Sequence, residues 1–167
     1  MSIFITSDHH FYHKNIIEYE KRPFNTVDEM NKAMIEKWNS VVKVNDEVYH
    51  LGDFALQSNT EEMRKLIKNL NGIIHLILGN HDWTKPFRYI RSGIESVHTS
   101  LYLDEFFLIH DPHNQKQIFY PLKQGKHILH GHMHSKKMND DRFTNMSVEH
   151  WDYTPVEIND LRVWVVK

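Results

Sequence analysis

The sequence contains no cysteine, and this absence removes several chemistries at once. Disulfide bonds, thiolate metal sites, iron–sulfur clusters and cysteine nucleophiles are all excluded. The absence is also compatible with a reducing cytoplasm. Any metal site in this chain must therefore be built from histidine, carboxylate and amide ligands.

Long hydrophobic runs and an excess of positive charge are also missing. No apolar run approaches the roughly 18 residues that a membrane helix needs. The N-terminal segment 1–5 has no basic stretch followed by a long apolar one, so we expect a cytoplasmic protein without a signal peptide. Twenty Lys and Arg residues against 22 Asp and Glu residues give a net charge of −2. Long nucleic acid and anionic membranes are therefore not expected partners, and any phosphate binding must be local.

Glycine and proline are sparse, whereas histidine is abundant. With 6 Gly, 5 Pro, 40% hydrophobic and 25% charged residues in 167, the composition is that of a globular chain without repeats or linkers. We expect a single domain over residues 1–167. Fourteen histidines are present, and many of them are grouped. Because neutral imidazole is the commonest protein metal ligand, the grouping suggests a site for more than one metal ion.

The N-terminal half alternates predicted strands and helices. Short β-prone runs predict strands over 3–7, 47–51 and 73–78. A capping box and helical apolar spacing predict a helix over 26–41, and a second apolar face predicts a helix over 59–70. Such alternation favours parallel strands joined by right-handed crossovers, with ligands gathering beyond the carboxyl ends of the strands.

Polar residues follow each of these strands. Asp8, Asp53 and Asn80 come directly after a strand or one residue later, so they are expected at one edge of the sheet. The second half is predicted to be a β-rich companion sheet with a loop between its strands. Its expected elements are a hairpin of 96–103 with 106–110, a loop over about 112–126, and strands near 127–130 and 142–146.

Two motifs place pairs of metal-type side chains two residues apart. Asp8 and His10 form one pair, and His132 and His134 form the other. In an extended backbone, residues i and i+2 point to the same face, so each pair is expected to serve one site. Either motif alone is common on protein surfaces without a metal.

The segment from Gly79 to Asp82 combines several useful properties. Glycine permits a tight turn, Asn80 offers a neutral oxygen ligand, and Asp82 is available to orient His81. His110 closes a separate apolar run, where a strand-end histidine without a metal is the plain alternative.

The five motifs together, in this order and each at a predicted strand end, resemble those of the calcineurin-like metallophosphoesterase family. The resemblance extends from Asp8 to about Pro155, and the short chain is similar to the small bacterial, archaeal and phage members. The run from Asp8 to Ile17, followed by Arg22-Pro23-Phe24, also resembles those small members. The implied fold is α/β, a two-sheet mixed β-sandwich flanked by α-helices, which agrees with the predicted elements.

The resemblance also implies two metal sites that share a carboxylate. One metal would be held by Asp8, His10, Asp53 and His134, and the other by Asp53, Asn80, His110 and His132. Sulfur-free ligands of this kind suit Mn²⁺, Fe, Zn²⁺, Co²⁺ or Ni²⁺, and the resemblance favours Mn²⁺.

The implied activity is hydrolysis of a phosphoric ester by a hydroxide that bridges two divalent ions, with His81 assisting the leaving oxygen. A small phosphorylated substrate is expected, with phosphodiesters, including cyclic or nucleotide ones, favoured over monoesters. Two alternatives stay open: a phosphomonoesterase of the same fold, and a catalytically idle interaction scaffold. The complete ligand set favours the enzyme.

Departures from the family pattern leave some residues ambiguous. His110 is followed by Asp111-Pro112-His113 where the family often has His-Gly, so His113 is an alternative ligand. His13 and Arg22 follow the first motif and are candidates for contacting the substrate phosphate; a solvated cation or a capping contact is the alternative.

Overall fold

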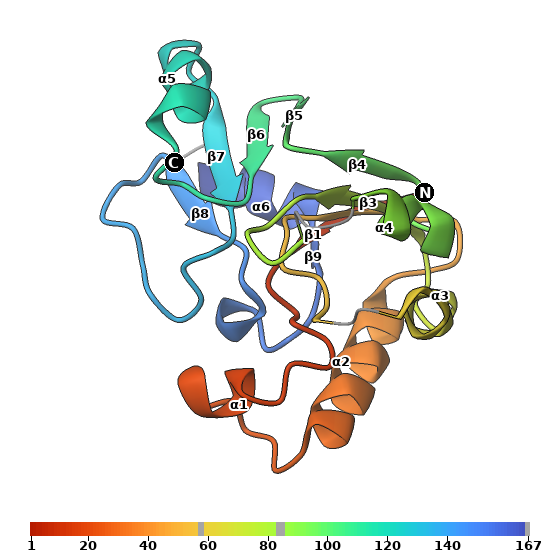
Figure 1. Ribbon diagram of the computed structural model, residues 1–167. Coiled ribbons are helices and arrows are strands. Elements are labelled where there is room, and N and C mark those ends of the chain that lie inside the picture. The colour runs from red at the N-terminus through yellow and green to blue at the C-terminus, as the bar shows by residue number, and fades with distance from the viewer. Residues whose placement is uncertain (57–58, 83–85, 166–167) are drawn as a thin grey trace.

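Two β-sheets lie between layers of helices in the computed structural model, which describes residues 1–56, 59–82 and 86–165 (Figure 1). The first sheet has the order β4-β3-β2-β1-β9, with β1 at Ile3–Thr6, β2 at Glu47–His50, β3 at Ile73–Ile77, β4 at Ser96–His98 and β9 at Val156–Glu157. The second has the order β5-β6-β7-β8, with β5 at Ser100–Leu103, β6 at Phe106–Ile109, β7 at His127–His130 and β8 at Phe143–Asn145. The α-helices are α1 at Ile16–Tyr19, α2 at Val27–Val41, α3 at Thr60–Lys68, α4 at Pro86–Ser92, α5 at Gln115–Lys123 and α6 at Ile158–Val165.

The predicted fold class is confirmed, because both sheets are mixed and helices flank them. In the first sheet, β1 to β4 are parallel and β9 pairs antiparallel with β1. In the second, β5 and β6 form the predicted antiparallel hairpin, and β6, β7 and β8 are parallel. Among the described residues, no helix is long and apolar enough to cross a membrane.

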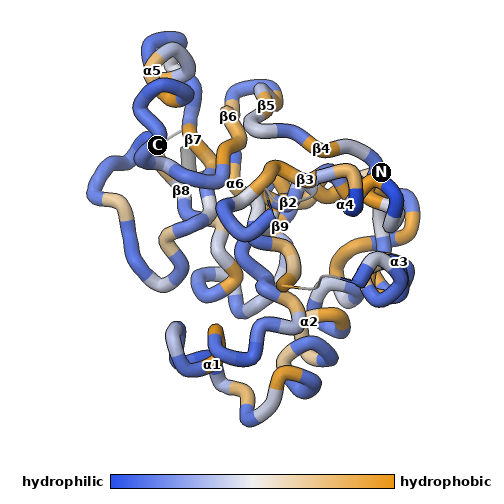
Figure 2. Tube along the Cα trace, viewed as in Figure 1, coloured by the Kyte–Doolittle hydropathy of each residue, from blue (hydrophilic) through white to orange (hydrophobic). Residues whose placement is uncertain are grey.

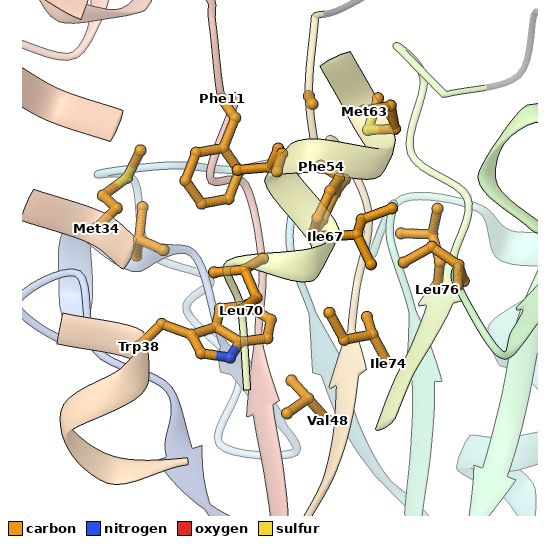
Figure 3. Close-up of a cluster of buried hydrophobic side chains, with 14 of the residues drawn as sticks. Phe11, Met34, Trp38, Val48, Phe54, Met63, Ile67, Leu70, Ile74 and Leu76 are labelled. Atoms are coloured by element: carbon orange, nitrogen blue, oxygen red, sulfur yellow. The ribbon is translucent and has the colours of Figure 1, made fainter. Parts of the chain in front are cut away.

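Helices α2 and α3 cover the outer face of the first sheet. Helix α2 begins as the capping box predicts, since the Thr26 hydroxyl accepts a hydrogen bond from the Glu29 amide at 3.1 Å. Its buried Trp38 packs with Leu70, which follows α3, and with Val48 and other strand residues (Figure 3). The apolar faces of both helices thus pack onto the parallel strands of the first sheet.

A second apolar layer holds the two sheets together. Ile5 and Ile77 of the first sheet and Leu51, directly after β2, pack in one buried cluster with Leu108 and Leu129 of the second sheet. The hydrophobic colouring of the chain is accordingly concentrated in the central strands (Figure 2). The carboxyl ends of the strands of both sheets can thus contribute to one site.

The predicted single strand over 96–103 is wrong, because the chain changes sheets at Thr99. Strand β4 continues the first sheet as the parallel partner of β3, and β5 starts the second. A continuous β-prone run does not specify which sheet each residue joins. The run is therefore split between two partners.

The predicted loop over 112–126 is also wrong, because it contains helix α5. Pro121 lies inside this helix and cannot donate a backbone hydrogen bond. Ile118 and Leu122 nevertheless pack with Phe107 and Ile128 of the second sheet. Burial of this apolar face outweighs the local cost of the proline. The short β9 and helix α6, both near the C-terminus, had no counterpart among the predicted elements.

Candidate metal centre

The loops after the parallel strands meet at one edge, as the alternation of elements predicts. The Asp8 amide donates to the Gly52 carbonyl, and the His10 amide donates to the Asp53 carbonyl, each at 3.0 Å. These bonds extend the pairing of β1 with β2 beyond the strands themselves. The first two motifs are therefore tied together by their backbones.

The backbone of the site is left-handed and not extended, so the reasoning from shared faces in a strand was wrong. Five of the seven predicted ligands have positive φ: Asp8 at 60°, His10 at 51°, Asp53 at 52°, His132 at 69° and His134 at 48°. Each such residue costs on the order of 1 kcal/mol or more and persists where the surrounding structure demands it. The pairs still converge, but through sharp turns that no alternation rule predicts.

Two glycines allow the strand-end loops to approach closely. A Cβ atom at Gly79 would collide with the backbone and carboxylate of Asp53. A Cβ atom at Gly131 would collide with the side chains of Ser7 and Asp8. Glycine at both positions is required by the proximity of the carboxylates.

One half of the centre is formed by Asp8, His10 and His134, whose ligand atoms all lie within 4.8 Å of one another. His134 Nε2 lies 3.9 Å from Asp8 Oδ1, and His10 Nε2 lies 3.4 Å from Asp53 Oδ2. The Asp8 carboxylate is fixed by the His132 amide and by the Ser147 hydroxyl. These four predicted ligands are thus brought together.

The other half is formed by Asn80, His110 and His132. Asn80 Oδ1 lies 2.9 Å from both His110 Nε2 and His132 Nδ1. His110 Nδ1 lies 2.8 Å from the Leu51 carbonyl, which turns Nε2 toward the centre, 3.6 Å from Asp53 Oδ2. The structure therefore places His110 here, whereas His113 is exposed.

The residues fit divalent metal ions. Asp8 and Asp53 are buried, with exposed fractions of 0% and 2%. Burial acts to raise the pKa of Asp53, but the His10 imidazole 3.4 Å away and the charge of His110 hold this pKa well below its usual value. His10 Nε2 is buried and has no hydrogen-bond partner among the described residues. Ionised carboxylates and unpaired imidazole nitrogens turned toward one space are what such an ion requires.

Comparison with known proteins agrees with this geometry. The profile of the calcineurin-like phosphoesterase superfamily domain matches residues 1–151. The chain belongs to this superfamily. The family depends on two metal ions, and this metallophosphoesterase has candidate metal-binding groups of histidine and aspartate.

Similar proteins come from archaea, phages and bacteria. An uncharacterised protein of Methanocaldococcus jannaschii is 40% identical, over 94% of this chain and 87% of its own length. The Gene 66 protein of Mycobacterium phage L5 is 29% identical, over 78% of this chain and 76% of its own length. A crystal structure of an Aquifex aeolicus protein of unknown function superposes with a TM-score of 0.74 at 24% identity, covering 97% of this chain and 98% of that one. The last likeness supports the fold of this metallophosphoesterase.

Asp82 does not orient His81, contrary to the prediction. Its buried carboxylate accepts hydrogen bonds from the amides of Asp53 and Gly79 at 2.6 and 2.9 Å, and from the Tyr89 hydroxyl at 2.5 Å. Burial raises the pKa of Asp82. Asp82 therefore shapes the loops that present Asp53. It makes no hydrogen bond to the His81 ring among the described residues.

His81 itself faces the centre from the solvent side. Its backbone amide donates to Asp53 Oδ1 at 2.9 Å, and its ring Nε2 lies 4.0 Å from Asp53 Oδ2. The side chain is 43% exposed, so it is accessible to a substrate. His13 lies nearby, with its Nδ1 atom 3.2 Å from His10 Nδ1, and burial lowers its pKa to about 4.

Arg22 lies behind the metal centre and not at its open side, where contact with substrate was predicted. Its buried guanidinium donates to the carbonyls of Asp8 and His9, each at 2.7 Å. It also donates to Glu149 Oε1 at 2.6 and 3.0 Å. This placement does not suit the predicted substrate-binding role, because the guanidinium already donates its hydrogen bonds to groups inside the protein.

Sequence reasoning missed Glu149, which connects Arg22 to His134. Glu149 Oε1 lies 3.3 Å from His134 Nδ1, so the other ring nitrogen of His134 is turned toward Asp8. Burial acts to raise the pKa of Glu149, but the hydrogen bond from His134 and the charge of Arg22 hold it at about 2. No motif marks this residue, since its partner Arg22 lies 127 positions away.

Proposed function

We propose that this metallophosphoesterase hydrolyses phosphodiesters with two divalent transition-metal ions, Mn²⁺ first among them. One ion would be held by Asp8, His10, Asp53 and His134, and the other by Asp53, Asn80, His110 and His132. The observation that supports this most is the position of Asp53, whose Oδ2 atom lies 3.4 Å from His10 Nε2 and 3.6 Å from His110 Nε2. A carboxylate between two ligand groups is suited to bridge two ions.

When bound, such a metal pair supplies a hydroxide at neutral pH and neutralises the charge on phosphate oxygens. The protein's own residues perform the remaining tasks. His81 lies at the exposed side of the centre, where its ring can donate a proton to the leaving oxygen. His13, neutral at pH 7 because of its lowered pKa, can donate a hydrogen bond to a phosphate oxygen.

The proposed substrate is a small phosphodiester, such as a nucleotide or a cyclic phosphate. A net charge of −2 gives no basic track for a long polyanion. The exposed His81 suits esters whose leaving group is an alkoxide, because such a group needs a proton when it departs. A phosphomonoesterase would use the same centre, and a scaffold would need neither the metals nor the exposed imidazole.

A substrate panel tests this proposal. Protein loaded with Mn²⁺ is assayed against bis-p-nitrophenyl phosphate, p-nitrophenyl phosphate, and 2′,3′- and 3′,5′-cyclic nucleotides. We expect kcat/KM to be higher for the diesters than for the monoester, with the activity lost on chelation. Faster hydrolysis of p-nitrophenyl phosphate would favour the monoesterase, and no metal-dependent hydrolysis at all would favour the scaffold.

A further inference from the structure

A small pocket opens directly beside the second half of the metal centre. Its volume is about 170 Å³, and Asn80, His110 and His132 form the wall that it shares with the centre. Three further segments contribute to the lining: the β4–β5 junction at Thr99, the loop after β6, and the start of α5, whose place beside β6 and β7 is seen in Figure 1. A group attached to a phosphate at the centre can therefore reach this pocket.

The rim of the pocket is polar and rich in hydrogen-bond acceptors. Asp111 Oδ1 accepts a hydrogen bond from the His113 amide at 2.8 Å, and its Oδ2 atom has no hydrogen-bond partner among the described residues. Asn114 donates through Nδ2 to Gln117 Oε1 at 2.9 Å, which leaves the Asn114 oxygen and the Gln117 amide nitrogen for a ligand. The Thr99 hydroxyl can both donate and accept.

The floor of the pocket is apolar and its size is limited. Leu78 and Ile109 are buried there. At about 170 Å³ the pocket is smaller than the roughly 300–1,000 Å³ of sites that enclose a drug-sized ligand. It suits a unit the size of glycerol or one sugar ring, with carbons on the floor and hydroxyls at the rim.

We propose that this pocket binds a hydroxyl-bearing alcohol group of the phosphodiester, a glycerol-sized or sugar-sized unit held by Asp111, Asn114 and Gln117. The proposal rests on the proposed phosphodiesterase function and names the class of ester that the enzyme prefers. A hydroxyl donates to Asp111 and accepts from Gln117, which matches the mixed rim.

Other substituents match the pocket less well. A second anionic group would meet the Asp111 carboxylate at close range. A plain alkyl or aryl group would remove water from the polar rim without replacing its hydrogen bonds, and an unsatisfied buried polar group costs about 1–3 kcal/mol. Discrimination should therefore depend on hydroxyl groups and not on size.

Two matched diesters test the proposal. The Mn²⁺-loaded protein is assayed with 2,3-dihydroxypropyl p-nitrophenyl phosphate and with propyl p-nitrophenyl phosphate, which share a leaving group and differ only in two hydroxyls. We expect the wild type to prefer the dihydroxypropyl ester by about tenfold or more in kcat/KM, as one or two hydrogen bonds imply. In Asp111→Ala the preference should fall to about twofold, because the hydrogen bond to the Asp111 carboxylate contributes most of the tenfold preference.

Two further variants keep the result interpretable. Gln117→Ala changes the rim from helix α5, away from the proposed metal ligands, and should also reduce the preference. Asp141→Ala, on an exposed loop, is the matched control and should keep it. Metal content is measured for every variant. A wild type without the preference, or Asp111→Ala and Gln117→Ala variants that both retain it, would overturn the proposal.

A binding measurement separates this proposal from the proposed function. Calorimetry on the Mn²⁺-loaded protein compares glycerol 3-phosphate with propyl phosphate, which requires no turnover. About tenfold tighter binding of glycerol 3-phosphate is expected, and equal affinities would overturn the pocket assignment. If neither diester is hydrolysed while p-nitrophenyl phosphate is, the phosphodiesterase proposal fails, and calorimetry alone decides the pocket.

Discussion

At the scale of single residues, Glu149 affects the metal centre through the side chains that it contacts. Its carboxylate receives both Arg22 and His134, while Arg22 also holds the carbonyls of Asp8 and His9. One buried carboxylate thus fixes the backbone of the first motif and the ring of the last. A carboxylate behind a metal-binding histidine orients the ring and raises its basicity.

Glu149→Gln should therefore weaken metal binding while the fold is kept. Glutamine retains the size and one acceptor oxygen but loses the charge that faces His134 and Arg22. We expect the affinity for Mn²⁺ at the site that includes His134 to fall about 10- to 100-fold, measured by calorimetric titration. Glu157→Gln, on β9, is the control. An Mn²⁺ affinity within twofold of the wild type would show that Glu149 does not position His134.

His81 gives a second prediction at this scale. Replacement by alanine should leave metal content and fold intact, yet reduce turnover by roughly 10²- to 10⁴-fold, the usual contribution of a positioned general acid. The loss should be smaller for a p-nitrophenolate leaving group than for an alkoxide, because the former needs little protonation. His113→Ala, an exposed histidine, is the matched control. Equal losses for the two leaving groups would remove the general-acid role.

The sequence predicts residue types here better than it predicts backbone conformation. Asp8, His10, His132 and His134 were identified from spacing and family resemblance, and the structure brings them together. Their left-handed backbones were not predictable, because they are imposed by contacts between distant loops. The same holds for Glu149, which finds its partner 127 residues away.

At the scale of elements, local sequence patterns predict a helix correctly where its caps and one apolar face determine its structure. The helices at α2 and α3 follow from their caps and apolar spacing. Helix α5 was missed because Pro121 argues locally against a helix, and its apolar face is satisfied only by the second sheet. The division between β4 and β5 depends likewise on partners that a single run of residues does not reveal.

Strand β7 begins with a buried histidine whose titration should affect stability. Burial lowers the pKa of His127 below the ordinary value of 6.5. The unfolded chain therefore binds a proton at this residue at a higher pH than the folded chain does. The contribution of neutral His127 to the free energy of unfolding is constant above pH 6.5. As the pH falls below 6.5, this contribution is lost by at most about 1.4 kcal/mol per pH unit.

His127→Gln should make unfolding less sensitive to acid. Urea unfolding of chelator-treated protein at pH 7.5 and 5.5 gives the free energy of unfolding of wild type and variant. Between pH 7.5 and pH 5.5 we expect the free energy of unfolding to fall by up to about 1.4 kcal/mol more in the wild type than in the variant. His113→Gln serves as the control. An identical pH dependence of wild type and His127→Gln would mean that His127 is accessible to protons in the folded state.

At the scale of the whole molecule, the metal centre belongs to both sheets. Asp8, Asp53 and Asn80 follow strands of the first sheet, whereas His110 and His132 follow strands of the second. The apolar layer between the sheets therefore determines the distances at the centre as much as the loops do. The motif order predicted this shared edge, but the packing that joins the sheets was visible only in the structure.

Metal stoichiometry measures directly whether these two sheets build a dinuclear centre. The protein is reconstituted with Mn²⁺, freed of excess metal and examined by elemental analysis, alongside Asp53→Asn. We predict two ions per chain for the wild type and at most one for the variant, because the amide removes the negative charge that both sites share. Fewer than one ion per chain in the wild type would contradict the dinuclear centre.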